Sequence, residues 1–392
     1  MNERIPGLTS TGSKRPAALF GSASAPDLPH HLARSEGCRV WDASGREYLD
    51  WIMALGAVAL GYGHPEVVAA ASEAAARGVV GPLPPVLEEE VAELLARHLP
   101  GVERVRFLKT GAEAMAAAVR LARVHTGRER VLGCGYHGWL DWCHREEPGI
   151  PAATGALFGE LPFNDAERSR DIIRVAGDSL AAVVFEPVIL APPDREWLTV
   201  LRDESQRVGA VLVADEIKTA GRLGLSGAAG QFGFQADLTV VAKAIANGFP
   251  LAAVGGSAAV MQSAERTWIS STLATESVAL AAARATIEVF ERESVAEHLD
   301  LIGRQLLHGL SELSARYPAV IQAVQGIPQM SACIWASEEI GSRVAAECAR
   351  RRLLLKRTPY NFPSLAHRES DVTWTLEVLS DVVATIAEDS AC

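Results

Sequence analysis

The chain has 392 residues, of which 48% are hydrophobic and 22% charged, an ordinary composition for a soluble globular protein. A formal net charge of -11 argues against nucleic acid and anionic membrane surfaces as partners. No apolar run approaches the ~20 residues of a membrane span, the N-terminus lacks an apolar signal-peptide core, and six cysteines in so long a chain do not make a disulfide framework. We therefore predict a cytoplasmic protein with two domains, or with one large domain and a smaller companion.

The first part of the chain predicts an arm and a hairpin. About thirty polar residues rich in Gly, Pro and Ser come first. Residues 38–51 then alternate on both sides of Ser44-Gly45, as in a β-hairpin. Residues 65–78 and 87–101 have helical patterns that end at Gly or Pro-Gly.

From Arg104 onward, short apolar strands alternate with longer helices. The expected helices are residues 112–127 and 196–209, and the expected strands are residues 104–108, 130–135, 180–188, 210–217, 236–245 and 251–257. This alternation predicts a parallel sheet covered on both faces. Residues 275–318 read as a long helical region that leads to a C-terminal α+β lobe beginning near residue 295.

The strand–turn–helix sequence FLKTGAEAMAAAVRLAR contains a candidate phosphate site. Thr110 and Glu113 have the spacing of a capping box, which in most proteins only caps a helix. Gly111, however, permits close backbone approach, and the first-turn N–H groups face outward at the positive end of the helix. The turn carries no Walker lysine and no dinucleotide fingerprint, so a phosphate bound here belongs to something smaller than a nucleotide.

Three further positions carry chemistry. Tyr136, at the mouth of a strand, is either an ordinary tyrosine or a ring that stacks on a planar ligand; the nearby Cys and His residues fit no common zinc spacing. Asp215, at the end of an apolar strand, is an N-cap, half of a metal-binding pair, or a ligand-binding carboxylate at the strand's carboxyl end. Lys243, within VVAKAIANGFPL, either extends its amine to water or serves a site.

Together these parts match the needs of pyridoxal 5'-phosphate. Its aldehyde forms a Schiff base with a lysine, and its ring nitrogen needs a carboxylate to stay protonated. The free N–H groups of the helical turn that begins at Gly111 would hold the phosphate, and Ile217, next but one after Asp215, would supply an apolar floor. The order of these residues along the chain is that of fold type I enzymes.

The sequence resembles the class III aminotransferases, in the style of glutamate-1-semialdehyde aminomutase, over nearly its whole length. The matching blocks are LDWIMALGAVALGYGHPEV, KTGAEA, YHG, VADEIKTAGR, AKAIANGFPLAAVGG, SSTLATESVALAAARATIEV and YNFPSLAHRESDV. The resemblance implies a large domain with a mostly parallel seven-stranded sheet (residues 56–294). It also implies a smaller α+β domain from both termini (residues 1–55, including the arm, and 295–392).

The resemblance also assigns roles. Lys243 is the Schiff-base lysine, Asp215 pairs with the ring nitrogen, Ile217 packs under the ring and Tyr136 stacks above it. Thr110, Gly111 and Ala112 match the residues that hold the phosphate, and Glu186 matches an active-site glutamate. Thr272 matches a threonine that reaches the phosphate of the neighbouring subunit, which implies a homodimer.

Departures from the family pattern concern the substrate. Ala18 replaces an arginine that holds the aminomutase's substrate, Leu55 replaces a pocket tryptophan, and ATES replaces SGNP. We expect an aminotransferase that moves an amino group from a donor such as L-glutamate to an aldehyde or ketone, with sugars and natural-product intermediates as candidate acceptors. The alternatives are an intramolecular aminomutase and, from another class, a non-catalytic binding protein with the same fold.

Overall fold

The computed structural model describes residues 4–391, and the ends of the predicted arm and small domain at residues 1–3 and 392 lie outside it. The chain forms two compact units, Pro65–Ser294 and Met1–His64 with Val295–Cys392. No helix among the described residues is both long and apolar enough to cross a membrane.

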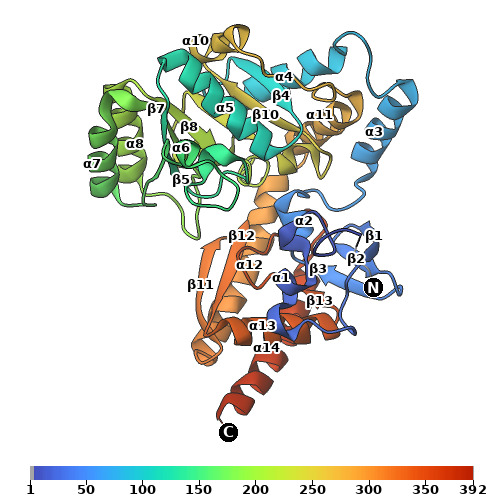
Figure 1. Ribbon diagram of the computed structural model, residues 1–392. Helices are drawn as coiled ribbons and strands as arrows, with labels where there is room; N and C mark the ends of the chain where they lie inside the picture. The colour runs from blue at the N-terminus through green and yellow to red at the C-terminus, as the bar shows by residue number, and fades with distance from the viewer. Residues whose placement is uncertain (1–3, 392) are drawn as a thin grey trace. The chain divides into compact units, whose positions relative to one another are not determined.

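The unit Pro65–Ser294 is built on a sheet, here called the central sheet (Figure 1). Its strand order is β4-β10-β9-β8-β7-β5-β6. Its strands are β4 (Arg104–Leu108), β5 (Arg130–Cys134), β6 (Phe158–Glu160), β7 (Leu180–Phe185), β8 (Val211–Asp215), β9 (Leu238–Val241) and β10 (Ala252–Gly256). Strands β9, β8, β7, β5 and β6 pair in parallel, while β10 runs antiparallel to both neighbours. The predicted mostly parallel sheet of seven strands is therefore confirmed within the described residues.

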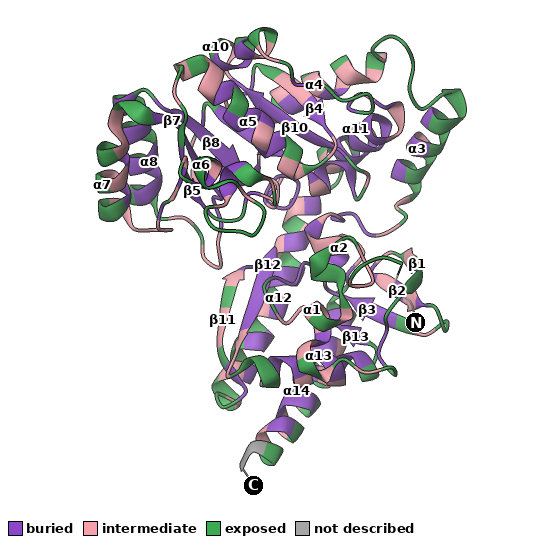
Figure 2. Ribbon diagram, in the orientation of Figure 1, coloured by how far each residue is buried: buried purple, intermediate pink, exposed green. Residues whose placement is uncertain are grey.

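Helices cover both faces of the central sheet, and α3 packs on the helix α11. The helices of this unit are α3 (Pro65–Arg77), α4 (Val86–His98), α5 (Gly111–Thr126), α6 (Ala152–Gly155), α7 (Ala166–Ala176), α8 (Arg195–Val208), α9 (Gly227–Phe232), α10 (Ala258–Met261) and α11 (Ser277–Arg292). Residues of β7 alternate between the two faces: Val184 packs in the cluster of α5, and Val183 packs in that of α8. Figure 2 shows β7, β8 and β10 as buried, as expected for a sheet with two covered faces.

The other unit contains a small sheet in the order β1-β2-β3-β13 and a separate hairpin, β11-β12. Its strands are β1 (Leu32–Glu36), β2 (Arg39–Asp42), β3 (Glu47–Asp50), β11 (Ile321–Ile327), β12 (Met330–Trp335) and β13 (Leu353–Leu354). Its helices are α1 (Pro16–Phe20), α2 (Met53–Gly56), α12 (Val295–Arg316), α13 (Glu338–Arg350) and α14 (Glu369–Ala391). The predicted hairpin at residues 38–51 is present as β2 and β3.

The short element α2 is not an ordinary helix. Met53, Ala54 and Leu55 have φ angles of 44°, 50° and 60°, a left-handed run that costs about 1–2 kcal/mol per residue in L-amino acids. The buried carboxylate of Asp50 supports it by accepting hydrogen bonds from the backbone N–H groups of Ile52 (2.7 Å) and Met53 (3.2 Å). The strained turn lines a cavity of about 460 Å³ within this unit.

Candidate active site

The site lies where β7, β8 and β9 end, which we call the carboxyl edge of the central sheet. Glu186 directly follows β7, Asp215 ends β8, and Lys243 comes two residues after β9, at the start of the 3-10 turn η5 (Lys243–Ala246). Because these three strands are parallel neighbours, residues distant in sequence meet at one edge.

Lys243 has an unusual backbone and an unusual environment. Its φ angle is 53°, a conformation that only a few per cent of non-glycine residues adopt. Burial of the amine, together with the nearby positive charge of Lys218, lowers the pKa of Lys243 to about 8. An amine with this pKa is partly uncharged near neutral pH, and only the uncharged form is a nucleophile or a base.

Asp215 is buried and paired with His137. The Nδ1 atom of His137 lies 2.8 Å from Oδ2 of Asp215, and the Ile217 backbone N–H donates to Oδ1 at 3.2 Å. The other ring nitrogen of His137, Nε2, is buried with no hydrogen-bond partner among the described residues. A proton placed on Nδ1 satisfies this arrangement and leaves Asp215 as the negative partner for a ligand.

Glu186 lies at the same edge with a cation of its own. Lys218 Nζ is 2.9 Å from Oε1 of Glu186, and the backbone N–H of Tyr136 donates to Oε2 at 3.1 Å. A Cβ atom on Gly135 would come within 2.6 Å of that Oε2 atom, so glycine is needed there. Sequence reasoning missed Lys218, although a charged residue three positions past the end of a buried strand was a usable signal.

Glu216, the residue after Asp215, faces away from this group. Its carboxylate accepts hydrogen bonds from the backbone N–H groups of Ala228 (2.9 Å) and Ala229 (2.7 Å) and from the hydroxyl of Thr219. Complete burial raises the pKa of the Glu216 carboxyl to about 7. Glu216 therefore secures the first turn of α9, and Asp215 is the carboxylate that remains available.

The predicted phosphate site, here called the cup, consists of Thr110, Gly111 and Ala112 at the N-terminus of α5. Thr110 Oγ1 accepts from the Glu113 N–H at 3.2 Å, and Glu113 Oε2 accepts from the Thr110 N–H at 2.9 Å, so the predicted capping box is present. Gly111 and Ala112 are in the first turn, where N–H groups lack intrahelical acceptors.

Two close approaches join the cup to the other parts of the site. A Cβ atom on Gly111 would lie 2.7 Å from Cδ1 of Ile217, and one on Gly138 would lie 2.7 Å from Cβ of Ala112. The cup, the predicted apolar floor and the loop that carries Tyr136 are therefore adjacent. Tyr136 itself is 68% exposed, which leaves its ring free to cover a ligand.

Three further residues singled out in the sequence belong to other segments of the chain. Thr272 is exposed, in the segment between the turn η6 (Gln262–Arg266) and α11. Ala18 is in α1 of the other unit, and its carbonyl accepts from Arg357 Nε at 3.2 Å. Leu55 lines the cavity beside the left-handed turn in that unit.

The histidine and cysteine residues after Tyr136 contact other groups of the protein. His137 pairs with Asp215, while Cys143 Sγ and His144 Nε2 lie 3.7 Å and 3.0 Å from the carbonyl oxygen of Gly138. Across residues 4–391, no group of three or more His, Cys, Asp or Glu side chains is arranged to hold a metal ion.

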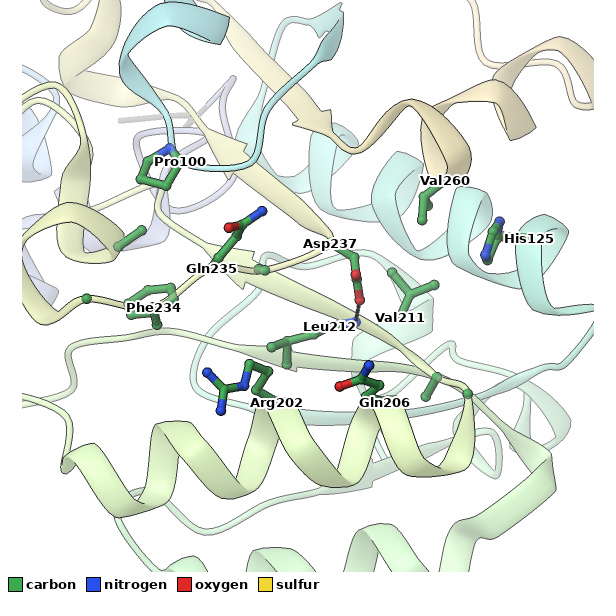
Figure 3. A pocket seen from close by; sticks show the side chains of 15 residues that line it. Pro100, His125, Arg202, Gln206, Val211, Leu212, Phe234, Gln235, Asp237 and Val260 are labelled. Atoms are coloured by element: carbon green, nitrogen blue, oxygen red, sulfur yellow. Dashed lines mark hydrogen bonds between the residues drawn. The ribbon is translucent and has the colours of Figure 1, made fainter.

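A cavity of about 830 Å³ lies at the opposite ends of β8 and β9, which we call the amino edge (Figure 3). Its lining includes the polar residues Arg202, Gln206, Gln235 and Asp237, none of them among the predicted site residues. Asp237 accepts a hydrogen bond from the Leu212 N–H at 2.8 Å. No lysine is among the described residues that line this cavity, so it is not the predicted site.

Comparison with known proteins agrees with this geometry. Residues 20–383 match the family model described as aminotransferase class-III, and the chain belongs to that family. It is 31% identical to glutamate-1-semialdehyde 2,1-aminomutase of Desulfitobacterium hafniense (98% of this chain, 97% of the relative). Among solved structures, FumI of Sphingopyxis sp. MTA144 with pyridoxal phosphate superposes with a TM-score of 0.89 at 27% identity (94% of this chain, 91% of that one). An omega-transaminase of Sphaerobacter thermophilus gives 0.84 at 26% (92% of each).

The protein is thus a fold type I, pyridoxal-phosphate-dependent enzyme of the class III aminotransferase family. The residues at the carboxyl edge fit this cofactor. Lys243 offers an amine, Asp215 a buried carboxylate, and the first turn of α5 its N–H groups for a phosphate. The close approach of Ile217 to Gly111 provides an apolar surface next to the cup.

Proposed function

We propose that the protein is an aminotransferase that moves an amino group from an amino acid such as L-glutamate to an aldehyde or ketone. The observation that carries the proposal is the group formed by Lys243, with its lowered pKa, and the buried Asp215–His137 pair on adjacent strands. A protein that only binds a ligand has no need of a buried, paired carboxylate beside a lysine of shifted pKa.

When bound, pyridoxal phosphate supplies an aldehyde carbon that accepts the amino group and a ring that delocalises the electron pair left by deprotonation. Lys243 would hold the cofactor covalently and, once released, move a proton as base and then acid. Asp215, oriented by His137, would keep the ring nitrogen protonated.

The remaining site residues would bind and orient the cofactor. Thr110, Gly111 and Ala112 would hold the phosphate, because a helix N-terminus attracts anions. Ile217 would pack under the ring and Tyr136 would stack above it, with Glu186 anchoring the backbone of Tyr136. These two covering side chains would restrict water at the reacting carbon.

An intramolecular aminomutase is the second candidate, supported by the likeness to glutamate-1-semialdehyde 2,1-aminomutase. Against it stands Ala18, where the resemblance to that enzyme leads one to expect an arginine that holds the substrate's carboxylate. The absence of this arginine fits better with intermolecular transfer to an acceptor that does not need it. The likeness to an omega-transaminase adds support for transfer.

We further propose that the working unit is a homodimer in which Thr272 completes the phosphate cup of the partner. Trp268 and Leu273, on either side of Thr272, are 82% and 51% exposed. The Ser277 N–H donates to the Val79 carbonyl at 2.8 Å, which brings a second exposed apolar segment to the same region. That segment contributes Val79, Val80, Leu83 and Val86. Apolar groups gathered in this way are typical of protein–protein contacts.

The function is tested by incubating the cofactor-loaded protein with L-glutamate and a panel of aldehydes, keto acids and keto sugars. An aminotransferase releases one 2-oxoglutarate for each amine formed on the acceptor. An aminomutase instead isomerises glutamate-1-semialdehyde with no second substrate, and a non-catalytic binder does neither. Sedimentation under the same conditions tests the dimer, and a fully active monomer would refute it.

A further inference from the structure

Lys218 lies in the site but has no role in the proposal so far. Its side chain is 15% exposed, and its Nζ atom lies 2.9 Å from Oε1 of Glu186, whose side chain is 6% exposed. Lys218 follows Ile217 in the loop after β8, and Glu186 directly follows β7. The pair therefore joins the ends of two adjacent parallel strands, next to the strand that leads to Lys243.

Four charged side chains that act on the amine of Lys243 balance one another. They are two carboxylates, Asp215 and Glu186, and two cations, Lys218 and the fully buried Arg222. With Lys243 uncharged, the set is neutral. If Lys218 were replaced by an uncharged residue, the neighbours would carry one net negative charge, and a proton on Lys243 would restore neutrality. In a site of low effective dielectric, a difference of one charge shifts the pKa of a nearby amine.

We propose that Lys218 is a positioning residue that holds Glu186 and balances the charge around Lys243, so that the uncharged amine needed to capture an aldehyde is available near neutral pH. The inference rests on the proposed role of Lys243. The direction agrees with the pKa of Lys243, which is lowered first by burial and next by the charge of Lys218. A cation beside a lysine is a known means of activating its amine.

The test measures the amine itself, in the full-length protein freed of cofactor. Acetic anhydride acylates only uncharged amines, so the labelling rate of Lys243 as a function of pH gives its titration midpoint. Peptide mass spectrometry follows Lys243, with the exposed Lys14 as the internal reference. No turnover is required, so this result does not depend on whether the protein proves to be an aminotransferase.

We expect Lys218→Met to raise the midpoint by about one pH unit, which lowers the labelling rate below the midpoint about tenfold. Lys218→Arg keeps the charge and should leave the midpoint in place. Glu186→Gln removes an anion and should lower it. The double variant K218M/E186Q restores neutrality and should return the midpoint to the wild-type value.

Lys109→Met is the matched control. Lys109 has the same 15% exposed side chain and a comparably buried partner, Glu276, at 2.7 Å, but its charge is not among those acting on Lys243. Its removal should leave the midpoint unchanged. Circular dichroism checks folding, and Lys218→Gln replaces K218M if the latter does not fold. A K218M or K218Q midpoint equal to wild type, or an equal shift in K109M, would overturn the proposal.

Discussion

The two edges of the central sheet differ in how far their charged groups are buried, although both edges are formed by β8 and β9. At the carboxyl edge, Asp215 and Glu216 are buried and Lys243 is half-buried. At the amino edge, Asp237 is exposed and also caps the Leu212 N–H (Figure 3). A buried charge costs several kcal/mol unless it is paired, whereas water solvates an exposed one. The carboxyl edge thus maintains a costly arrangement that folding alone does not require.

The strongest test of this contrast is Lys243→Ala. Loss of the covalent attachment point and of the proton carrier should lower turnover on the order of 10⁴-fold or more. Some cofactor should still bind through the cup. Steady-state kinetics measures the loss, and borohydride reduction with peptide mapping should find the wild-type cofactor on Lys243. Turnover within about tenfold of wild type would remove this residue from its role.

The next largest effect is expected for Asp215→Asn. An amide cannot hold the ring nitrogen protonated, so the rate of deprotonation of the donor should fall at least ~100-fold, the scale for removing a preorganised charge. Cofactor affinity should fall less, because the cup and Lys243 remain. Single-turnover kinetics with L-glutamate separates the two effects. An unchanged rate would point to Glu186 as the ring's partner, since Glu216 is engaged by α9.

A smaller effect should appear in the pH dependence of stability. The pKa of the Glu216 carboxyl is raised to about 7, so the folded state holds this proton more tightly than the unfolded state. Its contribution is fully present below the unfolded pKa, near 4.5, and is lost as the pH rises through 7. The free energy of unfolding of the Glu216→Gln variant should therefore fall less over this pH range than that of the wild type, by on the order of 3 kcal/mol. Urea unfolding between pH 4 and 8 measures it, and parallel curves for both proteins would contradict it.

The smallest effect is expected at the amino edge. In Asp237→Asn the amide oxygen can still accept from the Leu212 N–H, and the residue is exposed. Stability should change by no more than about 0.5 kcal/mol, and turnover should stay within about twofold of wild type. Thermal unfolding and steady-state kinetics provide the check. A loss comparable with that of D215N would mean that the two edges do not differ in function.

The candidate site residues that the sequence could propose each belong to a local feature. A capping box depends on residues three apart, as in Thr110 and Glu113. An apolar strand followed by a charged residue marks a strand end, as at Asp215. The pairing of His137 with Asp215 spans 78 residues, and that of Glu186 with Lys218 depends on the order of β7 and β8. Neither pairing has a local pattern.

The sequence by itself determined three properties: the alternation of apolar strands and helices, the order of the motifs and the acidic composition. The alternation can be read locally because hydrophobic periodicity extends over only a few residues. Tertiary structure alone decided the strand order, with β10 inserted antiparallel between β4 and β9. It also decided the left-handed turn at Met53–Leu55, which Asp50 supports against its local preference. The charge balance around Lys243 belongs to the same class, since it is a sum over side chains that only folding brings together.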